Sequence, residues 1–148
     1  MLIDLGANPF IRDKFGHNII HIATQGDKVR SIHYLLKNYN FYANDWDDKD
    51  SSPLHWAAYL NKEVSLCYLL AWGANPNVQD MDGNTPLHLA VMRNPDHGYQ
   101  TRCIRILLLK GAEWGIENYW EETPMHKIHP EAANRTEIEA ILVSDVTV

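Results

Sequence analysis

Isoleucines and leucines recur at intervals of three and four residues in four separate segments of this chain. Residues at that spacing lie on one side of an α-helix, so the pattern is typical of helices that bury one face. It predicts helices over about 29–37 and about 136–143, with two more between them. The four apolar sets are Ile32, Leu35 and Leu36; Leu66, Leu69 and Leu70; Ile104, Leu107 and Leu108; and Ile138, Ile141 and Leu142.

A second kind of helix start follows a polar turn in residues 80–90, which read DMDGNTPLHLA. Asp80 and Gly83 are typical of a tight turn, because aspartate bonds the nearby backbone and glycine adopts positive φ without steric cost. Thr85 then caps a helix that begins at Pro86, where the missing N–H has no helical partner to lose. The segment therefore predicts a hairpin-like turn followed by a helix.

This turn and helix start recur along the chain. Related strings begin at Asn18, Ser52 and Thr123, and the histidines of all four strings are separated by 34, 33 and 38 residues: His21, His55, His88 and His126. A second landmark repeats the same three intervals: Gly6, Asn40, Gly73 and Gly111. Two landmarks with equal spacing indicate four copies of one unit, each with an inner helix after the turn and an outer helix with the buried stripe.

The third copy is close to a Thr-Pro-Leu-His-x-Ala consensus, and with a period near 33 residues the chain resembles the ankyrin-repeat family. The resemblance implies an all-α solenoid of stacked helix-turn-helix units joined by hairpin-like turns, with about four repeats and a partial one at the start. We expect a single array over 1–148, divided as follows: 1–8, the tail of a truncated repeat; 13–41, repeat 1; 47–75, repeat 2; 80–113, repeat 3; and 118–148, a divergent repeat 4.

Three units depart from this consensus. The first lacks Thr-Pro, the second has Asp50 in place of the turn glycine, and the fourth has Glu121 there. The third carries an insertion at 94–100 that contains proline and glycine and is expected to be a loop. This loop is interpreted either as a tolerated surface insertion or as an extended binding edge that uses His97 and Tyr99.

The two ends lack the polar cover that a terminal solenoid unit needs. Residues 1–5 resemble the last turn of an outer helix, and the helix at 136–143 has an apolar face with nothing polar after it. We therefore expect the chain to be a segment of a longer protein or of a longer array.

Composition narrows the function classes. The net charge of -6 and pI of about 5.7 argue against nucleic-acid binding, which needs clustered lysine and arginine. The sequence shows no signal peptide and no apolar stretch long enough to enter a membrane directly. Cys67 and Cys103 are isolated, so we expect both to be packing residues in a reducing cytoplasmic setting.

Histidines and acidic residues often form catalytic or metal sites in proteins, but their spacing in this sequence predicts neither kind of site. The repeat histidines His21, His55, His88 and His126 are expected to bond the backbone of an adjacent turn, since one ligand per repeat is too widely spaced for zinc. His126 and His129, three apart on a predicted helix, lack further ligands. Asp45, Asp47, Asp48 and Asp50 lack the spacing of a calcium loop, so we expect a solvated acidic turn. No metal, cofactor or catalytic activity is predicted.

The function class that remains is the binding of another protein or peptide. The ankyrin resemblance implies that turn residues and the ends of the inner helices line one concave face, where a protein or peptide partner binds a monomeric array. The residues expected to carry binding are Phe15, Trp56, Tyr59, Met81, Met92, Arg93, Tyr119 and Trp120. Core packing is the alternative role for Trp56. Other positions expected on this face are Lys14, His17, Gln25, Asp48, Lys49, Ser51, Leu60, Asp82, Asn84 and Glu122.

A narrower resemblance concerns PLHWAAY at 53–59, YLLAWGAN at 68–75 and the following DGNTPLHLAV. These strings are similar to the ankyrin region of DHHC-type protein S-acyltransferases, the palmitoyltransferases. That resemblance implies repeats that recruit substrates by binding short disordered peptides at the cytosolic face of a membrane. The DHHC motif is absent from these residues, so no catalytic residue is carried over.

Overall fold

The computed structural model describes residues 5–39, 43–92 and 101–144, and within those ranges the regular structure is entirely helical. The elements in chain order are α1 (Ile19–Gln25), α2 (Val29–Asn38), α3 (Pro53–Tyr59), α4 (Glu63–Ala71), α5 (Pro86–Met92), α6 (Arg102–Leu109), the short 3-10 helix η2 (Pro124–Lys127) and α7 (Arg135–Ser144). The all-α solenoid of stacked helix pairs is confirmed.

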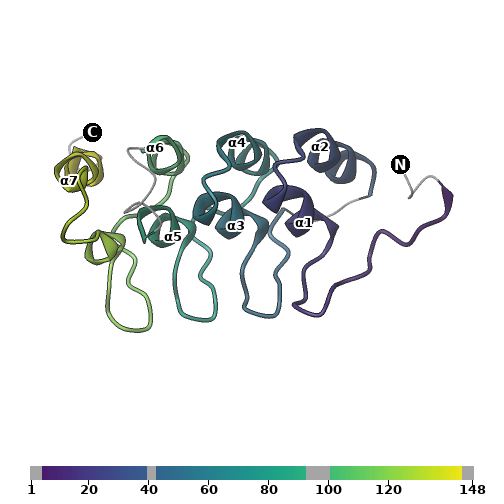
Figure 1. The fold of residues 1–148 in the computed structure, drawn as a ribbon, viewed down its shortest axis with the longest axis horizontal. Helices are drawn as coiled ribbons and strands as arrows, with labels where there is room; N and C mark the ends of the chain where they lie inside the picture. Colours follow the sequence, from purple (N-terminus) through teal and green to yellow (C-terminus); the bar gives the residue numbers. More distant parts are fainter. Residues whose placement is uncertain (1–4, 40–42, 93–100, 145–148) are drawn as a thin grey trace.

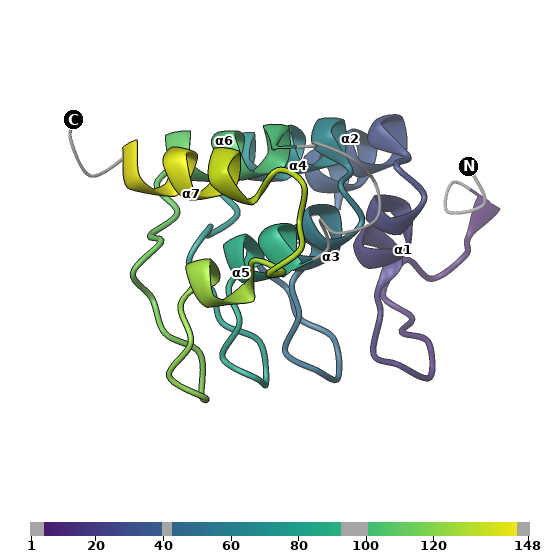
Figure 2. The ribbon, with the colours of Figure 1, turned by 60° about the vertical axis from the view of Figure 1, so that its left-hand side comes forward.

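The helices form two rows. Figure 1 shows α1, α3 and α5 in an inner row that η2 continues, and α2, α4, α6 and α7 in an outer row beside it. The hairpin turns project from the inner row, and the turned view shows them side by side along the same edge (Figure 2). Below, the "hairpin face" is the surface made by these turns and the inner helices, and the "outer face" is the solvent side of the outer row.

Each inner helix begins with a cap that uses the repeat histidine. In α3 the Ser52 side chain accepts a hydrogen bond from His55 N at 3.4 Å, and Ser52 N donates to His55 Nδ1 at 3.0 Å. Asn18 and Thr123 make the same reciprocal arrangement with the histidines three residues later. Because both partners satisfy backbone groups that a helix start leaves unpaired, these short helices begin at a fixed residue.

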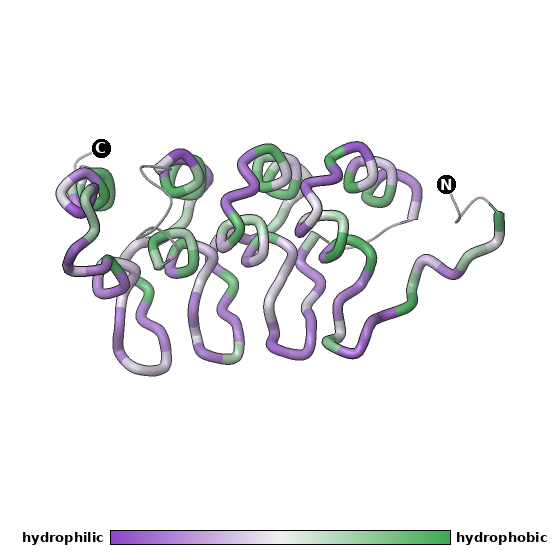
Figure 3. Tube along the Cα trace, viewed as in Figure 1, coloured by the Kyte–Doolittle hydropathy of each residue, from purple (hydrophilic) through white to green (hydrophobic). Residues whose placement is uncertain are grey.

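The core is a continuous apolar layer between the rows. Its buried members include the predicted stripes except Leu70, which is only partly buried at the edge of the core, and each buried leucine or isoleucine contributes about 1.5–3 kcal/mol to stability. Figure 3 shows hydrophobic residues where the helices face one another and hydrophilic residues along most of the hairpin turns. The largest fully buried apolar side chains are Ile20, Ile32, Leu35, Leu54, Leu66, Leu69, Leu87, Ile104, Leu107, Ile138 and Leu142.

Neighbouring hairpins are joined through their backbones. Asp48 N donates to Phe15 O at 3.1 Å, Met81 N to Lys49 O at 2.9 Å, and Tyr119 N to Asp82 O at 3.1 Å. One such bond links each hairpin to the next. The hairpin turns therefore hold a fixed register, which brings side chains from different repeats onto one surface.

The fourth unit differs from the expected helix-turn-helix. Pro124–Lys127 is a 3-10 turn, and Ile128 already has extended backbone angles (φ -69°, ψ 119°). The predicted helix face that would carry both His126 and His129 is therefore wrong, since the turn ends before His129. Pro130 disfavours helical angles at His129, which leaves too few residues for an α-helix.

Two sequence expectations about exposure are corrected. Cys67 is exposed on α4, whereas Cys103 is buried on α6, where burial raises the pKa of its thiol to about 12. The buried stripe of α4 is set by Leu66 and Leu69, so Cys67 points away from the core whatever its residue type. Asp47, expected in a solvated turn, is buried. The predicted loop at 94–100, Arg93 and Asn40 lie outside the described residues.

Candidate protein-binding surface

The repeat histidines tie each inner helix to the next hairpin. His21 Nε2 lies 3.0 Å from Ser51 O, His55 Nε2 lies 2.9 Å from Asn84 O, and His88 Nε2 lies 2.9 Å from Glu122 O. With Nδ1 accepting from the cap backbone, each ring uses both nitrogens in the neutral form. His126 caps its own turn through Thr123 N at 3.0 Å and is exposed, because no further hairpin follows η2 in the described part of the chain.

Burial keeps the imidazoles of His21, His55 and His88 neutral. Desolvation lowers the pKa of His21 and His88 and lowers that of His55 to about 4, although the carbonyl bond of each opposes the shift. Across residues 5–39, 43–92 and 101–144, no three histidine, cysteine or acidic side chains cluster as metal ligands would. The histidines therefore act as structural links between repeats.

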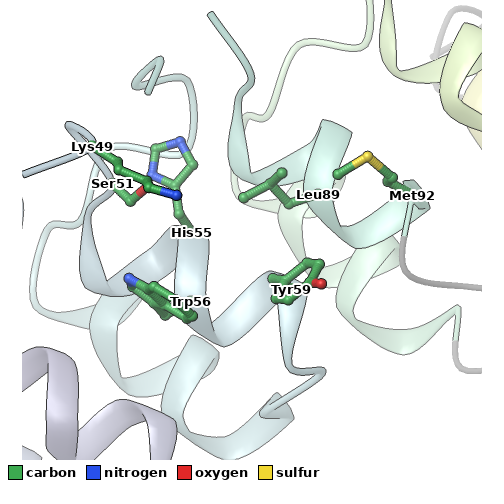
Figure 4. A pocket seen from close by; sticks show the side chains of 7 residues that line it. All are labelled: Lys49, Ser51, His55, Trp56, Tyr59, Leu89 and Met92. Carbon is green, nitrogen blue, oxygen red and sulfur yellow. The ribbon is translucent and has the colours of Figure 1, made fainter. Parts of the chain in front are cut away.

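A hollow of about 250 Å³ lies on the hairpin face between α3 and α5. Trp56 and Tyr59 of α3 form one wall and Leu89 and Met92 of α5 the other, as Figure 4 shows. The hairpin residues Lys49 and Ser51, together with His55, close one end. Its walls are mainly aliphatic and aromatic, so the hollow suits an apolar side chain of a partner.

A second hollow of about 320 Å³ lies on the other side of Trp56, between the first two hairpins. Trp56 and Lys49 line both hollows, so the indole forms the partition between them. The other residues that line the second hollow are Lys14, Phe15, His17, Asp47 and Asp48. The Lys14 ammonium lies 5.0 Å from the centre of the Phe15 ring, within cation–π distance. This hollow combines an aromatic edge with charges of both signs.

Trp56 is held in place by a buried carboxylate. Its indole Nε1 donates to Asp47 Oδ2 at 2.9 Å, and the same oxygen lies 3.3 Å from His17 Nε2. The His17 ring also meets the indole edge-on, with ring centres 5.2 Å apart. Three segments of the chain, two hairpins and α3, thus fix the orientation of one aromatic side chain.

Asp47 is ionised in this setting. It is only 4% exposed, and burial alone would raise the pKa of its carboxyl group. The hydrogen bond from Trp56 and the backbone bonds from Lys49 and Ser51 outweigh that effect and lower the pKa. This arrangement was not predicted from the sequence. The sequence does place Asp47 at the turn position that Asp80 holds in the next repeat. It does not show that His17, which comes from the preceding repeat, covers Asp47.

The predicted binding residues separate into two groups. Tyr59, Met92 and Trp56 share the first hollow, and Phe15 joins Trp56 in the second. Met81, Tyr119 and Trp120 are exposed on later hairpins and line neither hollow. Trp56 is half-buried, so one part of its side chain packs inside and the other faces the surface, where its predicted binding role stays a prediction.

Two other positions expected on this face are buried, and one lining residue was not predicted. Ser51 and Asn84 are buried because their carbonyl oxygens accept hydrogen bonds from the histidines of the preceding repeat. Ser51 nevertheless lines the first hollow. Leu89 lines the first hollow although it was not named. It occupies in the third unit the position of Trp56 in the second, a correspondence that the repeat spacing already contains.

Comparisons with known proteins agree with this geometry. The family profile described as ankyrin repeats in three copies matches residues 1–80, and one described as ankyrin repeats in many copies matches residues 54–108. No helix in the described part of the chain is long and apolar enough to cross a bilayer.

Several curated proteins are distant relatives. SH3 and multiple ankyrin repeat domains protein 2 of Homo sapiens is 30% identical over 124 residues, which cover 83% of this chain and 6% of that protein. Palmitoyltransferase AKR1 of Debaryomyces hansenii is 31% identical over 125 residues, or 79% of this chain and 15% of that protein. The enzyme of the same name from Saccharomyces cerevisiae is 27% identical over 112 residues, or 72% and 14%.

This chain thus spans less than a fifth of each of those three relatives. The helix pairs, the histidine links and the profile matches lead to one conclusion. The chain belongs to the ankyrin-repeat family, whose repeats are generally protein-binding modules.

Proposed function

We propose that this chain is a non-catalytic interaction module that binds a protein or peptide partner on its hairpin face. The observation that carries the proposal is the pair of hollows on either side of Trp56. An extended segment laid across the hairpins can place one side chain in each hollow. Aromatic residues in such pockets typically dominate interface energy.

The fixed geometry of Trp56 supports this role. Asp47 and His17 hold the indole before any partner arrives, so binding does not have to order this side chain. The edge-on contact between Trp56 and Tyr59, with ring centres 6.5 Å apart, extends the ordered surface toward α5. A preformed aromatic wall favours a partner that adapts its own shape to the groove.

A peptide array followed by matched substitutions tests the proposal. Tyr59→Ala combined with Trp120→Ala is expected to weaken a captured peptide by about 1–4 kcal/mol while the fold is retained. The matched control combines Tyr68→Ala with Trp72→Ala, which removes the same side-chain types from the outer face. Unchanged affinity in the first variant and lost affinity in the second, measured by calorimetry, would place the partner on the wrong face for this proposal.

The alternative is that the chain is the substrate-recruiting segment of a membrane-bound DHHC-type palmitoyltransferase. Its support is the similarity to two fungal proteins named palmitoyltransferase AKR1, together with the strings at 53–59 and 68–75. Sequencing the transcript beyond Val148 separates the two candidates. Apolar spans flanking a DHHC motif would indicate the enzyme and a module at the cytosolic face of a membrane. A stop codon or further repeats would indicate a cytoplasmic adaptor.

A further inference from the structure

The solvent side of α4 is apolar. Val64, Tyr68 and Trp72 are spaced by four residues, so they form one line along the outward side of the helix and its C-cap. Cys67 lies beside them and is also exposed. An outer helix ordinarily turns charged or polar residues to water. The outward side of α4 is instead apolar, although the opposite side of this helix already packs Leu66 and Leu69 into the core.

The apolar line continues across neighbouring helices. Aligning the buried stripes of the outer helices places Ala71, Leu109 and Val143 at one equivalent outward position, next to Trp72. Leu109 is 82% exposed and Val143 is half exposed. On the other side, the His33 ring of α2 meets both Tyr68 and Trp72 edge-on, with ring centres 6.0 Å apart in each case. The exposed apolar residues therefore belong to one surface rather than to one helix.

Basic residues surround this surface. Residues 28–39, 62–72 and 101–110, which contain α2, α4 and α6 with their caps, hold seven lysines and arginines and one acidic residue, a net charge of +6, while α7 holds one arginine and two glutamates, a net charge of -1. These four outer segments together carry +5, and because the whole chain carries -6, the rest of it carries -11. Acidic side chains gather instead in the hairpin turns, at the opposite edge of the molecule (Figure 1).

Several of these basic groups are available to a partner. Arg102 and Arg105, each more than half exposed, make long contacts of 3.5 Å with the partly exposed Glu63 and Glu137. Arg30, Lys37 and Lys110 have no ion-pair partner among the described residues and are exposed. They flank the apolar line on α2 and α6. The outer face thus presents aromatic and aliphatic side chains between two positively charged margins.

We propose that the outer face docks on an anionic phospholipid bilayer surface. Tryptophan and tyrosine favour the interface between headgroups and hydrocarbon, and lysine and arginine are drawn to the negative surface potential of acidic lipids. The basic and apolar residues spread over a row of neighbouring helices (Figure 1), an extent that suits a planar surface better than a single partner helix. The opposite charge of the hairpin turns orients the array, with the outer face toward the bilayer and the hairpin face toward the solvent.

Vesicle co-sedimentation tests this proposal. The chain is expected to bind vesicles of phosphatidylcholine with about one third phosphatidylserine at low salt and to dissociate at about 0.5 M salt, where charges are screened over a few ångströms. Vesicles of phosphatidylcholine alone are expected to bind at least about tenfold less protein. Trp72→Ala with Tyr68→Ala is expected to reduce binding to the anionic vesicles as well.

A pair of charge-reversal variants supplies the matched comparison. Arg30→Glu with Lys110→Glu is expected to lower vesicle affinity at least about tenfold, whereas Lys14→Glu with Lys49→Glu, on the hairpin face, changes the net charge equally and leaves vesicle binding within about twofold. Circular dichroism melting curves check that both variants fold. Equal losses in the two variants, or no binding of the parent chain to anionic vesicles at low salt, would overturn the proposal.

An acidic protein partner is the competing occupant. If immobilised poly-glutamate captures the chain through Arg30 and Lys110 and anionic vesicles do not, the outer face is a protein site and the bilayer proposal is wrong. The proposal is independent of peptide binding on the hairpin face. Loss of vesicle binding with peptide affinity intact counts against the bilayer surface alone.

Discussion

At the scale of single residues, the buried histidines couple folding to pH. His55 is fully buried, and burial lowers its pKa from 6.5 to about 4, while His21 and His88 shift in the same direction. The unfolded chain therefore takes up protons at a higher pH than the folded one. Stability from this source is complete above pH 6.5 and is lost as the pH falls from 6.5 toward 4.

We expect His55 alone to reduce the free energy of unfolding by about 2 kcal/mol between pH 7 and pH 5. Urea denaturation at a series of pH values measures the slope. His55→Asn is expected to flatten it, and His126→Asn, which changes an exposed repeat histidine, is expected to leave it unchanged. A slope that is identical in all three proteins would contradict this account.

Asp47 offers a second prediction at this scale. Asp47→Asn keeps an oxygen for the backbone N–H groups of Lys49 and Ser51 but removes the charge beside His17 and places an amide donor where Trp56 Nε1 donates. We expect a loss of about 1–3 kcal/mol in urea denaturation, with a shift in tryptophan emission.

The matched control is Asp80→Asn, at the equivalent turn position. Burial raises the pKa of Asp80, so its charge is unfavourable, and within the described part of the chain its side chain accepts hydrogen bonds only from the backbone of Asp82 and Asn84. This substitution is expected to be neutral or slightly stabilising, as the natural Asn118 at the same place in the last hairpin indicates. Equal losses at Asp47 and Asp80 would mean that the turn, and not the Trp56 contact, carries the effect.

At the scale of elements, the hairpin turns keep one backbone geometry although their turn residues differ. Asp50 and Glu121 replace the turn glycine yet adopt φ values of 56° and 60°, in the same left-handed region as Gly16 and Gly83. The replacement of glycine by Asp50 and Glu121 therefore leaves the backbone geometry of the turn unchanged. The outer helices were predicted from their apolar spacing because that spacing alone determines which face can be buried.

Most of the differences in burial between prediction and structure share one cause. Asp47 is covered by His17, and the carbonyls of Ser51 and Asn84 are covered by the preceding repeat, so burial at these positions depends on a neighbour about 30 residues away. Cys67 was misplaced for a different reason, since residue type was given more weight than its place between Leu66 and Leu69. The candidate site was predicted by residue, through Trp56, Tyr59 and Met92, but not by its division into two hollows.

A glycine comparison tests the packing of hairpins. A Cβ at Gly83 would lie 2.7 Å from Tyr119 N in the next hairpin, whereas a Cβ at Gly73 meets nothing within 4 Å, and both glycines have positive φ (77° and 92°). Gly73→Ala is expected to cost about 1 kcal/mol from backbone strain alone, and Gly83→Ala about 2–4 kcal/mol because the hairpins must also separate. Thermal unfolding of the two variants measures the difference. Equal costs would show that hairpin contact adds nothing to the strain.

At the scale of the whole molecule, each unit is stabilised by the units beside it. In a solenoid the total stability is close to a sum of unit and interface terms, so a central unit contributes to two interfaces and a terminal unit to one. Leu87 on α5 and Leu142 on α7 are both fully buried leucines. The helix α5 packs against both α3 and η2, whereas α7 lies at the end of the outer row (Figure 2).

The same substitution at these two places should therefore have different consequences. Leu87→Ala is expected to lower the free energy of global unfolding by about 2–5 kcal/mol, with faster hydrogen exchange throughout the array. Leu142→Ala is expected to raise exchange mainly in α7 and leave α1 to α5 protected, because the terminal helix can open without exposing the central interfaces. Peptide binding between α3 and α5 should survive the second change at temperatures where the first abolishes it. If Leu142→Ala instead exposed every helix equally, the array would unfold as one unit and binding at its centre would depend on its last helix.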